Sequence, residues 1–458
     1  MSTAIIPPPN RRIGVTYLRP GDPGYDQAVT AWNPIGSHRP AMVAMAEHPE
    51  HVVEAVRYAK AHGLGVGVMA TGHGTGRPVD EGGLLINTSG MQGLGVDPVT
   101  ATARVEAGVS WNQLNRRAAR HGLIGLQGSN SIVGVVGYSL GGGFGWLGRH
   151  FGFASQTIRS AELVTADGEL ITVNDDNHPD LFWGLRGSAG NLGIVTALDV
   201  RLVELDVVYG GALFYPLDYA RGVLTGYAEW AAEQPDEMAS SAVLINFPPL
   251  PFVPEPLRGK SFVSVRVCYS GADLRRGVGA VRDLRYQLGE PLIDNVRRMP
   301  AVELDAISAE PSDGMPVVMH GEMLPALSPG LIEAVTREQT ADSPLMFVEM
   351  RHLGGALRVG DEQLSPLNRT TAAFSFNALG PAFDPELRAA AQAKLDSLAV
   401  GIAPFADGSA YVNFMEGPGA EMGRAFAPAE WERLVALKAT WDATNLFRFN
   451  RNIAPRAA

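Results

Sequence analysis

Two glycine-rich segments constrain this chain more than any other feature of its sequence. The first is Ala70-Thr71-Gly72-His73-Gly74-Thr75-Gly76, which places one histidine inside a tight backbone turn. The second runs from Gly134 to Gly145 and contains six glycines. Glycine allows positive φ and a close approach of the backbone to a ligand. The two segments therefore predict that their backbone lies against a large, flat ligand.

Length and composition limit the possible classes of protein. The chain has 458 residues, of which 46% are hydrophobic, so we expect two domains or one two-lobed unit. No run approaches the ~18 apolar residues of a membrane span, and residues 1–12 contain no apolar signal-peptide core. The net charge of −11 comes from scattered acids, which argues against nucleic acid because no basic stripe could neutralise phosphates.

The cysteine content adds a further limit. Cys268 is the single cysteine, so no internal disulfide and no thiolate metal site can form. We therefore expect a reducing cytoplasm as the location, and we expect no metal. The sequence does not distinguish a monomer from a homodimer.

The first two hundred residues alternate between helix and strand patterns. Apolar residues at helical spacing predict a helix over 50–62. Ser110 is a candidate N-cap for a second helix that Gly122 closes. Short apolar runs predict strands over 65–70, 84–88 and 103–109, and a hairpin is predicted over 161–173. This alternation is typical of an α+β domain with helices on one face of a sheet.

The middle of the chain has a different pattern. Residues 210–400 alternate helices with strands, which suggests an antiparallel sheet backed by helices. The helices are expected over 219–233, 273–287 and 329–340, and the strands over 261–269, 316–324 and 345–353. The pattern changes again toward the end, with a strand expected over 410–414 and a helix over 428–441. These changes divide the chain into segments 1–207, 208–405 and 406–458.

Three short motifs match known kinds of site without the context that those sites need. Residues 143–148 fit the dinucleotide fingerprint G-x-G-x-x-G, but Gly152 interrupts the long helix that must follow. Ser139 fits the serine hydrolase elbow G-x-S-x-G, but the glycines after it disfavour the required helix. His48 and His51 have metal-ligand spacing, and a solvated helix start explains them better.

His73 is the stronger candidate. Its turn follows a predicted buried strand and precedes Pro78, so no helix continues from it. Successive turn amides form an anion nest that suits a pyrophosphate, and an imidazole beside that nest could attack a bound cofactor covalently. A loop histidine that only makes a backbone hydrogen bond is the alternative interpretation. Together with the second glycine-rich segment, the turn favours a flavin dinucleotide.

Longer motifs carry a family resemblance that covers the whole chain. Asp180-Leu181-Phe182-Trp183-Gly184-Leu185-Arg186-Gly187, continued by Gly190-Asn191-Leu192-Gly193-Ile194-Val195, resembles D-L-F-W-A-x-R-G-x-G-x-N-F-G-V-V. Tyr411-Val412-Asn413-Phe414 and residues 445–453 resemble Y-x-N-[YF] and N-x-F-x-x-N-x-x-I. The chain thus resembles the vanillyl-alcohol oxidase superfamily, which has a PCMH-type FAD-binding domain. Within it, the chain resembles the berberine-bridge-enzyme-like FAD oxidases, and the pattern is most similar to the bacterial 6-hydroxy-D-nicotine oxidase branch.

The resemblance implies a two-lobed α+β fold. Residues 1–207 would form the FAD-binding domain, and residues 406–458 would complete it. Residues 208–405 would form a substrate-binding domain with an antiparallel sheet backed by helices.

The resemblance also implies which residues hold FAD. The histidine of the Gly72-His73 element would carry the flavin through its 8α-methyl group. Asn130 stands where many relatives attach the flavin a second time through a cysteine, so a single covalent link through His73 is implied. Val133 stands where a small residue leaves room for O2, which favours an oxidase over a dehydrogenase. The implied FAD-binding residues are Ala70, Thr71, Gly72, His73, Gly74, Thr75, Asn130, Val133, Gly134, Gly137, Tyr138, Gly142, Gly145, Gly190, Gly193, Ile194, Val195, Asn413, Asn450 and Asn452.

The substrate is expected on the antiparallel sheet, opposite the flavin. Glu349 and Arg351 share one face of a predicted strand by the period of two, and they could orient a polar substrate or simply pair with each other. His320 and Glu322 are weaker candidates on the preceding strand. The other catalytic candidates are Tyr411 and Tyr138; a tyrosine hydroxyl at the flavin edge could take or orient a substrate proton.

The reaction implied by the resemblance is hydride transfer to flavin N5 from a C–H beside an alcohol or amine of a small molecule. Two electrons would then pass to O2 and give H2O2. A dehydrogenase with another acceptor, or a cyclisation or aromatisation enzyme of a natural-product pathway, stays open within the same fold. Outside that fold, a serine hydrolase using Ser139 and a flavin fold that only binds a metabolite are the alternatives.

Overall fold

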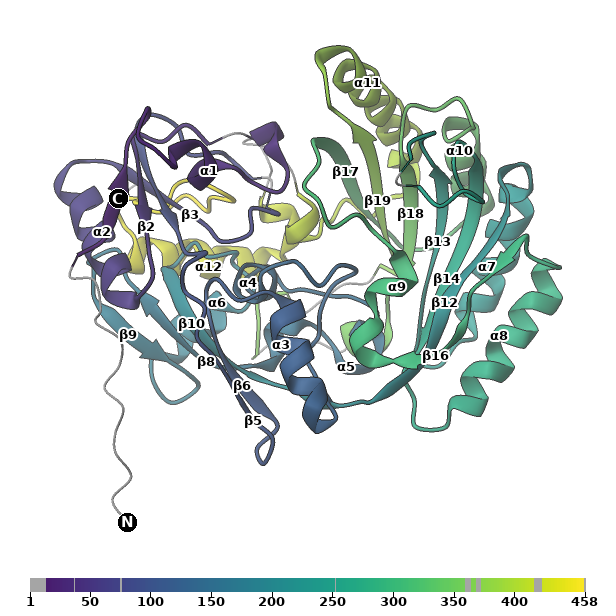
Figure 1. The fold of residues 1–458 in the computed structure, drawn as a ribbon, viewed down its shortest axis with the longest axis horizontal. Helices are drawn as coiled ribbons and strands as arrows, with labels where there is room; N and C mark the ends of the chain where they lie inside the picture. The colour runs from purple at the N-terminus through teal and green to yellow at the C-terminus, as the bar shows by residue number, and fades with distance from the viewer. Residues whose placement is uncertain are drawn as a thin grey trace.

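A computed structural model describes residues 14–36, 38–74, 76–251, 253–358, 364–367, 372–415 and 422–456. Figure 1 shows two lobes side by side: the N-terminal half and the C-terminal end of the chain form one, and the middle of the chain forms the other. The chain therefore returns to its first lobe after completing the second. This arrangement confirms the predicted α+β fold with an antiparallel, helix-backed sheet in one lobe.

The first lobe contains a small sheet that carries the histidine turn. Its strands lie in the order β1 (Thr16–Leu18), β2 (Met42–Met45), β4 (Gly83–Asn87) and β3 (Gly65–Met69). The β2–β4 and β3–β4 pairs are parallel and the β1–β2 pair is antiparallel. Helix α2 (Pro49–Ala61) corresponds to the helix predicted over 50–62, and it packs against β2, β3 and β4. The short helix α1 (Tyr25–Val29) precedes β2.

A second sheet in this lobe is fully antiparallel. Its order is β5 (Leu94–Asp97), β6 (Thr102–Glu106), β10 (Ile194–Arg201), β8 (Ile158–Val164) and β9 (Leu170–Val173). The predicted hairpin over 161–173 is thus the β8–β9 pair. Short pieces complete the lobe: β7 (Leu123–Ile124) paired with β11 (Val203–Glu204), α4 (Val135–Leu140), α5 (Gly148–Phe151) and α6 (Pro179–Leu185).

Helix α3 (Trp111–Ala118) has the cap that its sequence predicts. The Ser110 side chain accepts a hydrogen bond from the Gln113 amide, and the Gln113 side chain accepts one from the Ser110 amide. A reciprocal capping box of this kind satisfies two otherwise unpaired amides. The helix tightens into a 3-10 turn and ends at Gly122, whose φ of 70° is the left-handed conformation that glycine adopts without strain.

The second lobe is built on one large antiparallel sheet. Its order is β15 (Ile293–Asp294), β12 (Val207–Pro216), β14 (Ser261–Tyr269), β13 (Met238–Asn246), β18 (Phe347–His352), β19 (Phe374–Pro381) and β17 (Val317–Leu324), with β16 (Arg297–Pro300) paired to β12. One face is covered by α7 (Ala220–Ala232), α8 (Leu274–Leu288), α10 (Pro329–Glu338) and α11 (Pro385–Ile402), as Figure 1 shows. The opposite face turns toward the first lobe, with the short helix α9 (Asp305–Ser308) between the lobes.

The C-terminal segment differs from the prediction in one element. Helix α12 (Pro428–Trp441) has the predicted bounds and packs against α6 of the first lobe. The strand predicted over 410–414 is wrong, because Val412–Phe414 forms a 3-10 turn closed by the bond from the Phe414 amide to the Tyr411 carbonyl. Side-chain hydrogen bonds of Tyr411 and Asn413 to the second glycine-rich segment hold this turn in place.

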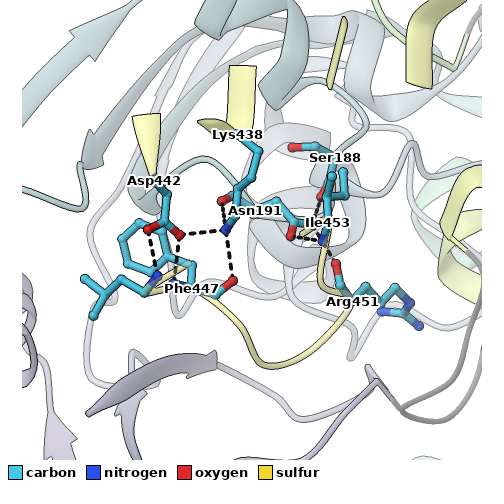
Figure 2. Close-up of polar contacts among 8 residues, drawn as sticks. Ser188, Asn191, Lys438, Asp442, Phe447, Arg451 and Ile453 are labelled. Carbon is cyan, nitrogen blue, oxygen red and sulfur yellow. Dashed lines mark hydrogen bonds and ion pairs between the residues drawn. The ribbon is translucent and has the colours of Figure 1, made fainter. Parts of the chain in front are cut away.

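A buried charged pair fastens this segment to the first lobe (Figure 2). Lys438 of α12 donates from Nζ to the Asp442 carboxylate at 2.6 Å and to the carbonyls of Asn191 and Phe447 at 2.9 and 3.1 Å. Both charged side chains are completely buried. The Asp442 carboxylate also accepts the amides of Leu446 and Phe447. All three ammonium donors are therefore satisfied, which is what a buried charge requires.

Asn191 extends this network to the last residues of the chain. The side-chain nitrogen Nδ2 of Asn191 donates to the carbonyls of Ser188 and Arg451, and the side-chain oxygen accepts the Ile453 amide at 2.6 Å. The N-x-F-x-x-N-x-x-I end of the chain is thus hydrogen-bonded to the Gly190–Val195 motif of the first lobe.

No helix among the described residues has the length and apolar character to cross a membrane.

Replacing Asp442 by Asn should lower the free energy of unfolding by about 3–5 kcal/mol, because the Lys438 ammonium then stays buried without its counter-charge. Urea unfolding followed by circular dichroism measures the change. Asp180→Asn is the matched control: it removes the exposed pair with Arg433 and should cost no more than about 1 kcal/mol. Equal unfolding midpoints for the two variants would contradict a structural role of the buried pair.

Candidate functional site

The His73 turn begins where β3 ends. Gly72 has a φ of 74°, and a Cβ placed on it would lie 2.5 Å from the Ala31 Cα, so glycine is required by both conformation and space. The imidazole of His73 stacks on the indole of Trp32, with ring centroids 4.9 Å apart and planes inclined by 17°. Backbone and ring are both fixed.

The two ring nitrogens of His73 have different surroundings. Nδ1 lies 2.9 Å from the Thr71 hydroxyl oxygen. That oxygen accepts a hydrogen bond from the Gly134 amide at 3.3 Å. Nε2 is buried and has no hydrogen-bond partner among the described residues. Burial lowers the pKa of His73 to about 4, so the ring is neutral at physiological pH.

The turn also presents unpaired backbone amides. Within the described ranges, the N–H groups of Gly72, His73 and Gly74 donate no hydrogen bond. Amides left unpaired in a turn are donors for an anion such as a pyrophosphate. Within the described ranges, the backbone N–H groups of Gly190 to Gly193 likewise donate no hydrogen bond, and Gly190 has a φ of 82°. Ile194 and Val195 continue from there as buried residues of β10.

The second glycine-rich segment forms α4 and then an irregular turn. Gly142 and Gly143 have φ values of 101° and 75°, and a Cβ on Gly141 would overlap the Asn413 side chain. Asn413 donates from Nδ2 to the Tyr138 carbonyl at 3.0 Å, and the Gly143 amide donates to the Tyr411 hydroxyl at 2.9 Å. The C-terminal segment therefore packs directly on this glycine turn.

The last residues of the chain reach the histidine turn from the other side. Asn450 has a φ of 60°, and its side chain exchanges hydrogen bonds with the Val68 backbone of β3 at 3.3 Å. Its own backbone pairs with Arg77. The side-chain oxygen of Asn452 is buried and, in the part of the chain that the structure describes, accepts no hydrogen bond.

These features together fit FAD. The His73 and Gly190 segments supply unpaired amides for phosphate and carbonyl oxygens, and His73 supplies a buried, unpartnered ring nitrogen. A Cβ on Gly137 would meet nothing within 4 Å, so there is open space beside α4. Orphaned buried polar atoms are rare in folded proteins and indicate a missing partner. The residues present are therefore those that an FAD molecule would satisfy.

Several predicted cofactor residues make contacts within the protein. Asn130 donates to the Pro311 carbonyl of the second lobe at 3.0 Å. The Val133 carbonyl accepts the Trp111 amide. Gly134 donates to Thr71, and a Cβ on Gly145 would overlap the Gln127 carbonyl. Ala70 lies at the end of β3 beside the turn, and the predicted residue Thr75 lies outside the described residues.

Glu349 and Arg351 face the first lobe from β18. Their neighbours Val348 and Met350 point into the core under the helices. Arg351 lies 3.1 Å from the Glu349 carboxylate and 2.6 Å from the Ser129 hydroxyl of the first lobe, and it stacks over the Trp146 ring. All of these charged side chains are buried. Arg351 thus links the large sheet to the first lobe.

Glu349 has a second cationic partner that sequence reasoning missed. Arg266 of β14, which is separated from β18 by β13, lies 3.5 Å from its carboxylate. Burial acts to raise the pKa of Glu349, but Arg351 and Arg266 outweigh it, so the pKa is below its usual value. A carboxylate held ionised between two arginines is a weak proton acceptor, so it suits positioning of a polar group better than general-base work.

The two tyrosines are both buried. Burial raises the pKa of Tyr411 to about 12 despite its hydrogen bonds to Asn413 and Gly143. Burial likewise raises the pKa of Tyr138 well above its usual value, and within the described ranges the Tyr138 hydroxyl has no partner. Both phenols are therefore neutral at physiological pH and keep a proton that they can donate. The Tyr411 oxygen accepts hydrogen bonds from the Gly143 amide and from Asn413 Nδ2.

Three weaker candidates lie elsewhere. His320 and Glu322 alternate along β17 with Gly321, which meets Phe414 of the first lobe, so they point toward the helix side of the sheet. His48 occupies the N-cap position of α2 without a side-chain capping bond. His51 is buried and accepts a hydrogen bond from the Glu47 amide, so the prediction of a solvated helix start is wrong for this residue. No group of three or more metal-binding side chains occurs in the described part of the chain. Ser139 is fully buried in α4, whereas a hydrolase elbow exposes its serine.

The dinucleotide fingerprint over 143–148 has no long helix after it, because α5 ends after four residues. This agrees with its rejection on sequence grounds.

Contacts between the lobes involve residues that the sequence did not reveal. The Asp305 carboxylate of α9 accepts the Gln127 side chain at 2.6 Å and the Ser131 amide and hydroxyl. Buried Arg149 donates to the carbonyls of Met238 and Leu353 in the second lobe. Sequence reasoning missed these partners because 174 residues separate Ser131 from Asp305, and 204 separate Arg149 from Leu353.

Comparison with protein families identifies two domains. Residues 40–174 match the FAD binding domain, and residues 410–454 match the domain described as berberine and berberine like. The chain is 28% identical to (R)-6-hydroxynicotine oxidase of Paenarthrobacter nicotinovorans, and the alignment covers all of both chains. An FAD-linked oxidoreductase of Dictyostelium discoideum is 27% identical over 96% of this chain and 95% of its own length.

Solved structures show the same architecture. The crystal structure of 6-hydroxy-D-nicotine oxidase from Arthrobacter nicotinovorans superposes with a TM-score of 0.84 at 26% identity, over 96% of this chain and 98% of that chain. A berberine-bridge-enzyme-like protein of Physcomitrella patens superposes with a TM-score of 0.82 at 19% identity, over 97% and 98% of the two chains. The second likeness concerns the fold alone.

Replacing Glu349 by Gln should lower the free energy of unfolding by about 3–5 kcal/mol, because Arg266 and Arg351 then lose their shared buried anion. The unfolding midpoint in urea measures this loss. Glu303→Gln, which removes an exposed pair with Arg297, should cost at most about 1 kcal/mol. A Glu349→Gln protein as stable as this control, yet inactive, would show that Glu349 serves catalysis alone.

Proposed function

We propose that this chain, an FAD-binding oxidoreductase similar to the berberine-bridge-enzyme-like proteins, is an oxidase whose FAD is bound covalently through His73. The observation that carries the proposal is the neutral imidazole with an unpartnered, buried Nε2 at the edge of unpaired amides. A neutral imidazole nitrogen has the lone pair that covalent attachment requires.

FAD, when bound, would take a hydride from the substrate and pass its electrons to O2, giving H2O2. The amides of the His73 turn and of Gly190–Gly193 would hold its phosphate and ring oxygens. Asn413, Asn450 and Asn452 would close the site from the C-terminal side. Val133, Ile194 and Val195 would keep water from the ring.

The proposed substrate is a small molecule with a CH–OH or CH–N group, and a natural product falls within this class. It would lie against the β18 face, where Glu349 and Arg351 orient a polar group. Tyr411 and Tyr138 are neutral phenols that would donate to or orient the substrate hydroxyl or amine. The similar sequence and the similar crystal structure both carry the name of a hydroxynicotine oxidase, which is in line with an amine or a ring alcohol.

We propose no nucleic-acid or membrane partner, a cytoplasmic location, and a monomer or homodimer. The scattered negative charge and the single buried cysteine support these expectations.

The purified protein should be yellow, and the colour should stay in the pellet after acid precipitation because the flavin is bonded to His73. His73→Ala should release the colour to the supernatant, whereas His121→Ala, at an exposed site, should not. A visible spectrum of both fractions is the measurement. A wild-type protein that gives up its flavin in acid would remove the covalent link, and a protein that takes up no FAD would refute the proposed function.

Val133→Ile should slow reoxidation by O2 by about tenfold, equivalent to about 1.4 kcal/mol of barrier, because the added methylene narrows the approach of O2. Anaerobic reduction by the substrate should be unchanged. Stopped-flow absorbance at the flavin band separates the two half-reactions, and Val99→Ile on the surface is the control. Wild-type protein that is reduced by substrate but reacts slowly with O2 would identify a dehydrogenase.

A further inference from the structure

Segment 309–316 joins α9 to β17 and runs along the side of the second lobe that faces the first lobe (Figure 1). Two side chains of the first lobe hold it there. Asn130 donates to the Pro311 carbonyl at 3.0 Å, and the Trp32 indole donates to the Ser312 carbonyl at 3.3 Å. The same indole stacks on the imidazole of the histidine turn. The segment is therefore fixed close to that turn.

Glu310 follows a residue with an unusual backbone conformation. Ala309 has a φ of 49°, in the left-handed region that a residue with a Cβ adopts only at a cost. Such conformations persist where surrounding contacts hold them, and they are frequent at functional sites. The Ser308 carbonyl accepts a hydrogen bond from Arg266 Nη2 at 3.2 Å, which ties this turn to β14. The backbone around Glu310 is thus held by the large sheet and by the first lobe.

Glu310 differs from two other carboxylates at the boundary between the lobes. Glu349 is held between two arginines, and the Asp305 carboxylate accepts hydrogen bonds from side chains of the first lobe. Glu310 is exposed and makes no hydrogen bond or ion pair with any residue that the structure describes. Its oxygens therefore keep their lone pairs available to a ligand.

The surroundings of Glu310 also make it a better proton acceptor than Glu349. Loss of solvation is the main cause that raises the pKa of Glu310, and the negative charges of Glu349 and Asp305 add to it. The cations Arg266 and Arg351 act in the opposite direction, but the pKa stays above its usual value. The pKa of Glu349 is lowered instead. A general base is most effective when its pKa approaches the working pH.

We propose that Glu310 is the catalytic base of the site and that its carboxylate accepts the proton of the substrate hydroxyl or amine. This inference rests on the proposed oxidase function and adds the residue that takes the proton. Glu349 then orients a polar group without taking part in proton transfer.

The proposed step removes two hydrogens from the substrate. The O–H or N–H bond breaks and its proton goes to a carboxylate oxygen of Glu310. The neighbouring C–H bond breaks as hydride, which FAD accepts, and a C=O or C=N double bond forms. The two electrons then pass to O2, and the Glu310 proton together with the transferred hydrogen completes H2O2. The carboxylate is thereby restored.

The first test is stability, and it needs no substrate. A carboxylate whose pKa is raised in the folded state destabilises the fold above that pKa, and this effect disappears as the pH falls through it. Glu310→Gln removes the effect, so its urea unfolding midpoint at neutral pH should equal or exceed that of wild type. Glu349→Gln should lie below both. A Glu310→Gln protein destabilised as much as Glu349→Gln would overturn the inference, because Glu310 would then stabilise the fold as an ion pair.

The second test measures the protonation of Glu310 directly. Infrared spectra of holoenzyme labelled with carbon-13 in its glutamate side chains are recorded across a pH titration. The difference between wild type and Glu310→Gln isolates the carboxyl band of Glu310. We expect the protonated form to persist above the ordinary glutamate pKa of about 4.3. A band that titrates at or below that value would overturn the inference.

The third test is the rate at which holoenzyme is reduced in the absence of O2. Benzyl alcohol and benzylamine represent the two substrate classes, and stopped-flow absorbance follows the flavin band. Glu310→Gln should be reduced about 100-fold more slowly than wild type. The control Glu303→Gln, at an exposed pair with Arg297, should match wild type. The wild-type rate should fall as the pH drops through the pKa of Glu310, and the Glu310→Gln rate should stay constant over that range.

A Glu310→Gln protein that is reduced as fast as wild type, or that keeps the wild-type pH dependence, would overturn the inference and leave the proposed function intact. Wild-type protein that neither compound reduces would instead count against the proposed function, while the unfolding and infrared results test Glu310 independently.

Discussion

The buried pair of Lys438 and Asp442 is the constraint on which the site depends. Its ammonium group binds the Asn191 and Phe447 carbonyls, and its carboxylate binds two amides of the chain end (Figure 2). Burying these charges is tolerable because all three ammonium donors and both carboxylate oxygens form hydrogen bonds. This pair aligns the chain end with the Gly190–Val195 motif, and Asn450 then reaches β3 directly beneath the histidine turn.

The second requirement is a fixed distance between the lobes. The histidine turn and the β18 face of the large sheet belong to different parts of the chain, and in the proposed function the distance between them decides whether a substrate can react. Asp305 and Arg149 bridge the lobes through buried hydrogen bonds, and Arg351 reaches Ser129 from the sheet. Hydrogen bonds weaken when the donor and acceptor move apart. These bonds therefore favour one distance between the two lobes and preorganise the site.

Local elements of this fold were predictable from sequence because their determinants are local. The Ser110–Gln113 capping box and Gly122 define α3, and the periodic apolar residues of α12 give its bounds. The His73 turn was predictable because few roles other than cofactor binding need a histidine between glycines. Arg266, Asp305 and Trp32 escaped prediction because each acts through a partner distant in sequence. The alternating pattern around Tyr411 predicts a strand because that pattern is local, whereas the bonds with Gly143 and Tyr138 that hold the 3-10 turn in place join residues far apart in the sequence.

A crystal structure of the protein as purified tests the central claim most directly. The account predicts electron density that runs without a break from the imidazole of His73 into the isoalloxazine ring, with the ring between the Gly134–Gly145 segment and the Glu349 face of β18. Density for a flavin that stops short of His73, or that lies outside this space, would contradict it.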